Sequence, residues 1–167
     1  MKEIKIKADS IPSDQIPEIL EENSILINRY AVDYFSHPRF SMLHPEEMTV
    51  VIASLQEIGF ENGATLNEIF MRISQIGLKL CLSGTGLFLR LAWIDQPKSS
   101  NSILSGTHSA PDQAVTVLSE ILEKDDAFPK GLYLRNVDGK LWLRGYICDF
   151  EYRFPADALF AFSKDQK

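Results

Sequence analysis

The chain has 167 residues, of which 45% are hydrophobic and 24% are charged, a composition typical of one globular domain rather than of a disordered chain. Its net charge of −6 disfavours general binding to nucleic acid or to an anionic membrane surface, because both depend on a positive field. We therefore expect a single domain over residues 1–167, without a membrane partner and with nucleic acid disfavoured.

Residues 1–44 are predicted to form a mostly helical N-terminal extension. Residues 3–7 alternate between charged and apolar side chains, which favours an edge strand. A helix is expected over residues 13–22 and a second one over residues 24–35, which are apolar on several sides. A connector that lies between two prolines follows over residues 37–45.

Residues 45–77 are predicted to form a pair of amphipathic helices. From Met48 to Ile58 the apolar residues recur at the i, i+3, i+4 and i+7 spacing of one helix face. In the second helix, Thr65 and Glu68 have the spacing of a capping box and precede a similar apolar stripe. Because the two stripes are so alike, we expect both helices to pack on one shared surface.

Residues 78–163 are predicted to form an antiparallel sheet, because the apolar period changes there from 3.6 to 2. The Gly-Thr-Gly stretch at 84–86 is similar to a phosphate cradle, but its place between two expected strands favours a hairpin turn. Polar and acidic connections separate the later strands. Strands are expected at 78–82, 87–94, 114–118, 131–146 (a hairpin) and 157–163. The fold class is therefore α+β, with N-terminal helices packed on a C-terminal antiparallel sheet.

The hairpin at residues 131–146 is the segment whose structure the sequence predicts in most detail. Asp138-Gly139 lies between two alternating runs and favours a two-residue type I′ turn, which fixes the strand register. In that register Leu132, Leu134, Leu141 and Leu143 share one face, which we expect to pack against the helices. The opposite face carries Tyr133, Arg135, Trp142 and Arg144.

Two interpretations of this polar and aromatic face remain open. An arginine beside an aromatic ring forms a cation–π pair, which is a sufficient structural reason for the pattern. Alternatively, the face binds an anion, a peptide carboxylate or a base, because arginine holds carboxylates and phosphates bidentately and rings provide a stacking surface. The expected partner is then a protein or a small anionic ligand. The candidate binding residues are Tyr133, Arg135, Trp142 and Arg144, with Asp95, Gln96 and His108 from the polar loop at 95–112.

The leading functional hypothesis is a non-enzymatic binding or accessory module. One alternative is a small thiol hydrolase or transferase that uses Cys148 as nucleophile and His108 as base. Another is a module that binds nucleic acid without sequence preference on the hairpin face that carries Tyr133, Arg135, Trp142 and Arg144. A winged helix is disfavoured, because the second amphipathic helix supplies only one basic residue, Arg72. His37 and His44 lack metal-ligand spacing, so we expect no metal and no cofactor.

The predicted environment is the cytoplasm. The start of the chain, MKEIKIKADS, has no apolar run of a secretory signal, and no stretch approaches the roughly 20 apolar residues that cross a bilayer. Cys81 and Cys148 both fall in strand-like segments and are interpreted as free thiols in a reducing compartment. An exposed sheet edge would also allow a homodimer.

Several motifs occur in a fixed order along the chain: GAT at a helix start, IGLKLC, LRLAWIDQP, FPKGLYLR and DGKLWLRGY. In their residues and in their order these motifs resemble those of a family of small bacterial proteins, over about residues 59–163. That family has no established biochemical activity, although some members carry a helicase label. This chain has no G-x-x-x-x-G-K-[ST] phosphate loop, and it departs from the family in having Leu82, not proline, after Cys81. The resemblance implies the layout of the domain and a bacterial origin, without a mechanism.

Overall fold

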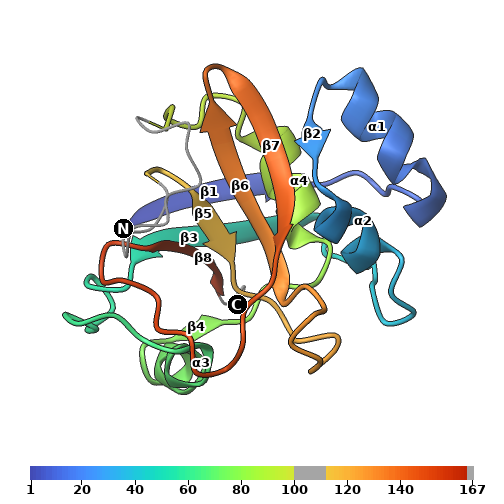
Figure 1. Ribbon diagram of the computed structural model, residues 1–167. Helices are drawn as coiled ribbons and strands as arrows, with labels where there is room; N and C mark the ends of the chain where they lie inside the picture. The colour runs from blue at the N-terminus through green and yellow to red at the C-terminus, as the bar shows by residue number, and fades with distance from the viewer. Residues whose placement is uncertain (100–111, 165–167) are drawn as a thin grey trace.

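The computed structural model describes residues 1–99 and 112–164 (Figure 1). In this part of the chain there are four α-helices, a short 3-10 helix and eight strands. In chain order they are β1 (Lys2–Lys7), η1 (Ser13–Gln15), α1 (Ile16–Glu22), β2 (Leu26–Ile27), α2 (Arg29–Phe35), β3 (Glu47–Ser54), α3 (Leu66–Gln75), β4 (Leu78–Lys79), α4 (Thr85–Ala92), β5 (Val115–Val117), β6 (Gly131–Val137), β7 (Lys140–Tyr146) and β8 (Leu159–Lys164).

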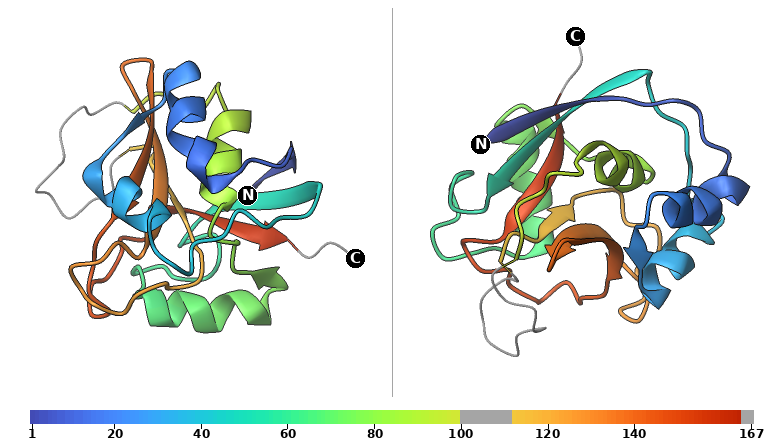
Figure 2. Two further views of the ribbon diagram at one scale, coloured as in Figure 1. Left: turned by 90° about the vertical axis from the view of Figure 1, so that its right-hand side faces the viewer. Right: turned by 90° about the horizontal axis from the view of Figure 1, so that it is seen from above.

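The eight strands form one mixed sheet that curves around α4. Their order is β1-β3-β8-β5-β6-β7-β2, with β4 paired to β8 outside this path. Most neighbours are antiparallel, but β5 runs parallel to β8 and β2 runs parallel to β7. Figure 2 shows α4 in the hollow of the curve, where it contacts β1 at one end of the sheet and β6 and β7 towards the other.

The sheet separates two apolar cores. The concave core lies between the sheet and helices α1, α2 and α4. The second core lies on the other face of β3 and β8 and is covered by α3. The central strands β3 and β8 are therefore buried on both faces.

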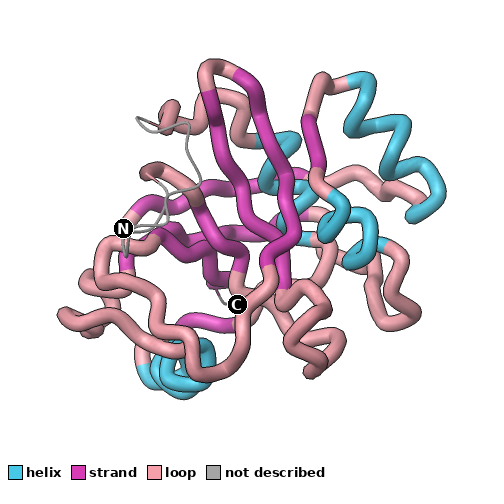
Figure 3. The backbone as a smooth tube through the Cα atoms, viewed as in Figure 1, coloured by secondary structure: helices cyan, strands magenta, loops and turns pink. Residues whose placement is uncertain are grey.

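The helix predicted from Met48 to Ile58 is wrong, because this segment contains strand β3 (Figure 3). Val50 and Ile52 face the concave core, while Val51 and Ala53 face the second core. A strand with both faces buried is apolar at almost every position. Such a run also satisfies the i, i+3, i+4 spacing by chance, so the spacing does not separate a helix from a strand here.

The strand predicted at residues 87–94 is wrong for a related reason, since this segment belongs to helix α4. All residues from Thr85 to Arg90 are buried, so the helix has no polar face and no visible 3.6-residue period. The hairpin turn predicted at residues 84–86 is also wrong, because these residues form the N-cap and the first turn of α4.

The helix predicted over residues 24–35 is confirmed only in its second half, as α2. Asn28 ends the short strand β2 and caps α2, because its Oδ1 accepts from the backbone N–H of Ala31 at 2.9 Å. The same amide group forms a pair of hydrogen bonds with the backbone of Gly145 on β7, at 2.9 and 3.0 Å. Asn28 therefore divides the segment and attaches α2 to the sheet.

Helix α3 begins with the predicted capping box. The hydroxyl of Thr65 accepts from the backbone N–H of Glu68, and the Glu68 carboxylate accepts from the backbone N–H of Thr65 at 2.7 Å. Gly77, with φ of +74°, follows the helix in the left-handed conformation that glycine tolerates. The expected pair of helices on a shared surface is not present, since α3 packs on the second core and its predicted partner is a strand.

The class is α+β, but the division along the chain differs from the expected one. Strands are spread from Lys2 to Lys164, so the helices are not gathered before an antiparallel sheet. Residues 1–44 include β1 and β2, residues 45–77 hold a strand and a helix, and residues 78–163 include α4. The predicted edge strand near the start and the strands expected at 114–118 and 157–163 are present as β1, β5 and β8. In the ranges described, no helix combines the length and the apolarity that crossing a membrane requires.

Candidate functional site

Strands β6 and β7 pair in the register predicted from their turn. Asp138 and Gly139 have φ values of +54° and +82°, as a type I′ turn requires. Arg135 lies opposite Trp142, and Tyr133 lies opposite Arg144. The predicted burial of the leucine face is confirmed, since Leu132, Leu134 and Leu143 are at most 1% exposed and Leu141 packs at the margin of the concave core.

Three residues on the other side of the hairpin form a half-buried surface, here called the aromatic–arginine face: Tyr133, Trp142 and Arg144. The Arg144 Cζ atom lies 4.9 Å from the centroid of the Trp142 ring and 5.8 Å from that of Tyr133. Both distances are within the range of cation–π attraction. Burial raises the pKa of Tyr133, and the neighbouring arginines partly oppose this rise, so its phenol is neutral at pH 7. The face thus carries one positive charge between two neutral rings.

The guanidinium of Arg144 has no acceptor in the part of the chain that the structure describes. It forms no hydrogen bond and no ion pair there, and its Nε atom is buried without a partner. A buried donor without an acceptor costs roughly 1–3 kcal/mol. Arg144 is therefore held in place by rings, and its Nη donors, unlike the buried Nε, are not among the buried atoms.

Arg135 is not part of this open face, which corrects its predicted outward position. Its side chain is only 1% exposed, and its Nε donates to the hydroxyl of Ser99 at 3.0 Å. The backbone N–H of Ser99 in turn donates to the carbonyl oxygen of Asn136 on β6 at 2.8 Å. The segment that follows α4 thus runs along β6 and covers Arg135, a contact between distant parts of the chain that strand alternation does not predict.

Gln96 lies close to β6, but its side chain is buried, whereas Asp95 is exposed. Gln96 is 2% exposed, and its side-chain amide donates to the carbonyl oxygens of Gln113 at 2.9 Å and Leu134 at 3.2 Å. His108 lies outside the described residues. Of the predicted binding residues that the structure describes, only Tyr133, Trp142 and Arg144 therefore form a common half-buried surface.

Sequence reasoning missed Arg90, the one charged residue of helix α4 (Thr85–Ala92). It is 0% exposed, and its Nη1 donates to Gln96 Oε1 at 2.5 Å and to the Trp142 carbonyl oxygen at 3.4 Å. Its Nη2 donates to the carbonyl oxygen of Trp93 at the end of α4. Burial lowers the pKa of Arg90 to about 10, so it is charged at neutral pH. The signal for it is a single charge within the apolar run LFLRLAWI.

The two thiols are not activated in this structure. Burial raises the pKa of Cys148 to about 11, although nearby Lys130 lowers it in part. Burial also raises the pKa of Cys81 to about 12. Because the thiolate is the nucleophilic form, both groups are in the unreactive protonated form at neutral pH.

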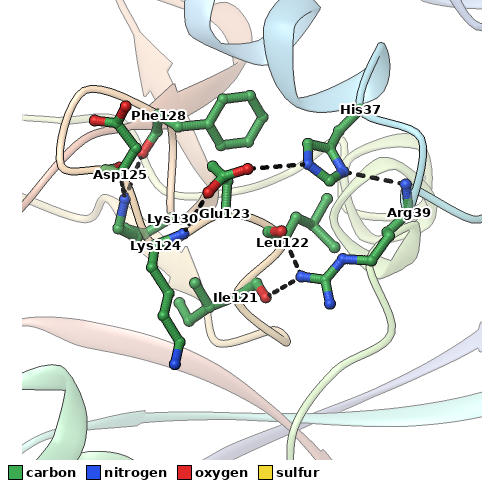
Figure 4. Close-up of polar contacts among 9 residues, drawn as sticks. All are labelled: His37, Arg39, Ile121, Leu122, Glu123, Lys124, Asp125, Phe128 and Lys130. Atoms are coloured by element: carbon green, nitrogen blue, oxygen red, sulfur yellow. Dashed lines mark hydrogen bonds and ion pairs between the residues drawn. The ribbon is translucent and has the colours of Figure 1, made fainter.

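Figure 4 shows a cluster of charged residues that joins the connector after α2 to the acidic loop before β6. His37 Nδ1 accepts from the backbone N–H of Arg39 at 3.1 Å, and its Nε2 lies 3.7 Å from a carboxylate oxygen of Glu123. The Arg39 guanidinium donates to the carbonyl oxygens of Ile121, at 2.8 Å, and Leu122. These side chains bond to each other and to the backbone, so the cluster fastens two loops.

Lys130 lies inside the same acidic loop. It is 0% exposed, and its ammonium group donates to the carbonyl oxygens of Asp125 and of Phe128, the latter at 2.7 Å. Burial lowers its pKa. Among residues 1–99 and 112–164, no three His, Cys, Asp or Glu side chains gather as a metal site would require.

Comparisons with models of protein families, with curated proteins and with solved structures find no match to this chain.

Proposed function

We propose that this chain is a non-enzymatic binding module of the bacterial family that its motifs resemble, and that it acts in the cytoplasm. Its aromatic–arginine face binds a partner molecule through a carboxylate or phosphate group. The observation that supports this proposal is Arg144, a guanidinium that rests against two rings and has no acceptor in the described chain.

The contacts of Arg144 match the requirements for anion recognition. A guanidinium presents a planar fork of donors that pairs with two oxygens of a carboxylate or phosphate. Trp142 and Tyr133 restrict the movement of this fork, so less conformational entropy is lost when a ligand binds.

Removal of the Arg144 charge tests the proposal. The probes are acetate, inorganic phosphate and a short acidic peptide with a free C-terminus, each titrated at constant ionic strength. In the unchanged protein we expect saturable NMR shifts of the Arg144 Nε–H and Trp142 indole signals. In Arg144→Met we expect the indole shift to disappear, since the charge-assisted hydrogen bonds are gone.

Lys140→Met is the matched control, because it removes an exposed positive charge from the same strand without touching the face. This variant should bind the probes as the unchanged protein does. If Arg144→Met and Lys140→Met respond equally to every probe, or if no probe causes a saturable shift, the proposed function is wrong.

A further inference from the structure

A cavity of about 470 Å³ lies where the C-terminal end of α3 meets β1, β3 and the turn that follows β3. Its volume is within the range of small-molecule sites, about 300–1,000 Å³. Four apolar residues of its lining belong to the second core or pack against it: Val51, Ile58, Ile76 and Leu78. The cavity therefore offers an apolar wall to the body of a small ligand.

Arg72, in the last turn of α3, is the basic residue that lines this cavity from the helix. Its Nε donates to the Ile58 carbonyl oxygen at 2.9 Å, and its Nη1 donates to Gln75 Oε1 at 3.2 Å. Its Nη2 forms no hydrogen bond within the described chain and is not one of the buried atoms. The guanidinium is thus fixed on one side and keeps donors that a ligand can reach.

Gly59 leaves these donors uncovered. Its φ is +104°, a conformation that residues with a side chain rarely adopt. A Cβ atom at this position would lie 3.0 Å from Arg72 Nη2. Any larger residue there would therefore displace the guanidinium or cover the part of it that has no partner.

The other charged groups at the cavity have partners of their own. The Glu3 carboxylate pairs with the Lys164 ammonium group. The Glu57 carboxylate lies 2.6 Å from the Met1 ammonium group. Arg72 forms no ion pair with any carboxylate of residues 1–99 and 112–164. Among the described residues that line the cavity, Arg72 therefore supplies the one unpaired charge.

We propose that this cavity binds a small molecule that carries a carboxylate group on a short aliphatic body. The carboxylate accepts from the Nη donors of Arg72, and the aliphatic part packs against Val51 and Ile58. A single unpaired guanidinium matches the single charge of a carboxylate better than the higher charge of a phosphate monoester. None of the lining residues belongs to the aromatic–arginine face, so the site does not depend on the function proposed for that face.

The test is an amide NMR titration of the whole chain with hexanoate at constant ionic strength. Parallel titrations use acetate, which lacks the aliphatic body, and hexan-1-ol, which lacks the charge. We expect saturable shifts of the Gly59 and Gly77 amides, with hexanoate saturating at a lower concentration than either of the other probes. If hexanoate causes no saturable shift, or binds no more tightly than acetate or hexan-1-ol, the proposal is wrong and Arg72 only complements the helix end.

Gln56→Glu tests the charge without removing a contact. The Gln56 side chain lines the cavity, is exposed and forms no hydrogen bond in the chain as described, so this isosteric change adds only a negative charge. It should weaken hexanoate binding several-fold and leave hexan-1-ol binding unchanged. Gln15→Glu, which adds the same charge at the exposed N-cap of α1, is the control. Equal hexanoate binding by these two variants would overturn the proposal.

Arg72→Met should weaken hexanoate binding roughly tenfold or more, since it removes hydrogen bonds to a charged group. Arg153→Met is the matched control, because Arg153 also donates to a backbone carbonyl near α3, that of Gly63 at 2.8 Å, without lining the cavity. Equal binding by the two variants would contradict the role of Arg72. Arg144→Met should leave the cavity shifts unchanged, so a failure of this site and a failure of the aromatic–arginine face are distinguishable.

Discussion

Arg90 and Arg144 both lie near Trp142, but their donors meet different surroundings. Arg90 is inside the concave core, where Gln96 and backbone carbonyl oxygens accept from its two Nη atoms, while its Nε, like that of Arg144, has no partner in the described chain. Arg144 is on the opposite, half-buried side of the hairpin, where the described chain offers it rings and no acceptor. The difference in burial explains this, because a charged group without hydrogen-bond acceptors costs far more free energy in a core than at a surface that a ligand or water can reach. We therefore assign a structural role to Arg90 and a binding role to Arg144.

Replacement of Arg90 by methionine should destabilise the protein. Methionine fills a similar space but leaves Gln96 Oε1 and the Trp93 carbonyl oxygen without this donor. We expect the free energy of unfolding to fall by about 3 kcal/mol, measured by urea denaturation. Lys5→Met, at an exposed position of β1, is the control and should change it by less than about 0.5 kcal/mol. An unchanged stability of Arg90→Met would show that these hydrogen bonds contribute little.

At the scale of elements, Asn28 joins α2 to β7 through one amide group. It caps the helix and also forms two hydrogen bonds with the Gly145 backbone. The close approach depends on Gly145, since a Cβ atom there would lie 2.5 Å from the carbonyl carbon of Tyr30. The helix therefore sits directly on the backbone of the strand.

Asn28→Ala should cost about 2–3 kcal/mol of unfolding free energy, because it removes a helix cap and leaves part of a strand backbone unpaired. Asn23→Ala is the control, since the Asn23 side chain is exposed and donates only to the Ile19 carbonyl oxygen. This control should cost less than about 1 kcal/mol. Chemical denaturation of the two variants side by side measures the difference, and equal losses would contradict the role assigned to Asn28.

Turn and capping motifs in the sequence correctly predicted the hairpin of β6 and β7 and the start of α3, because these features depend on residues close together in the chain. The Asp138-Gly139 turn fixed the hairpin register, and the Thr65 capping box located the start of α3. By contrast, β3 and α4 are buried on all sides, so their hydrophobic patterns contain no period that separates a helix from a strand. Their conformations depend on neighbours that are distant in sequence.

The residues of the candidate site likewise fall into those that local sequence patterns predict and those that depend on distant parts of the chain. Tyr133, Trp142 and Arg144 were predictable, because strand alternation and a known turn place them on one face. The burial of Arg135 and Gln96 was not, since it arises where residues 95–99 run along β6. Arg90 could have been suspected only as one charge in an apolar run.

At the scale of the whole molecule, one curved sheet separates two cores, and each thiol packs against one of them. Cys81 belongs to the concave core and Cys148 packs against the second core. Burial holds the pKa of Cys81 at about 12, above its ordinary value of 9.0. The folded chain therefore keeps a thiol proton that the unfolded chain releases near pH 9.

Stability should accordingly fall as the pH rises above 9, because the folded state binds more protons than the unfolded state there. For Cys81 the loss approaches about 1.4 kcal/mol per pH unit. Urea unfolding under reducing conditions between pH 8 and roughly pH 10.5 measures this slope. Cys81→Ala should show a flatter slope, although its stability at pH 7 is lower. Identical slopes for both proteins would contradict the burial of this thiol.

The position of β8 has a consequence for synthesis on the ribosome. This strand lies at the centre of the sheet, between β3 and β5, although it comes near the end of the described chain. Until it emerges, β3 lacks one neighbour and α3 has no second strand to cover. The nascent polypeptide must therefore keep its early segments from aggregating until a late one completes the sheet.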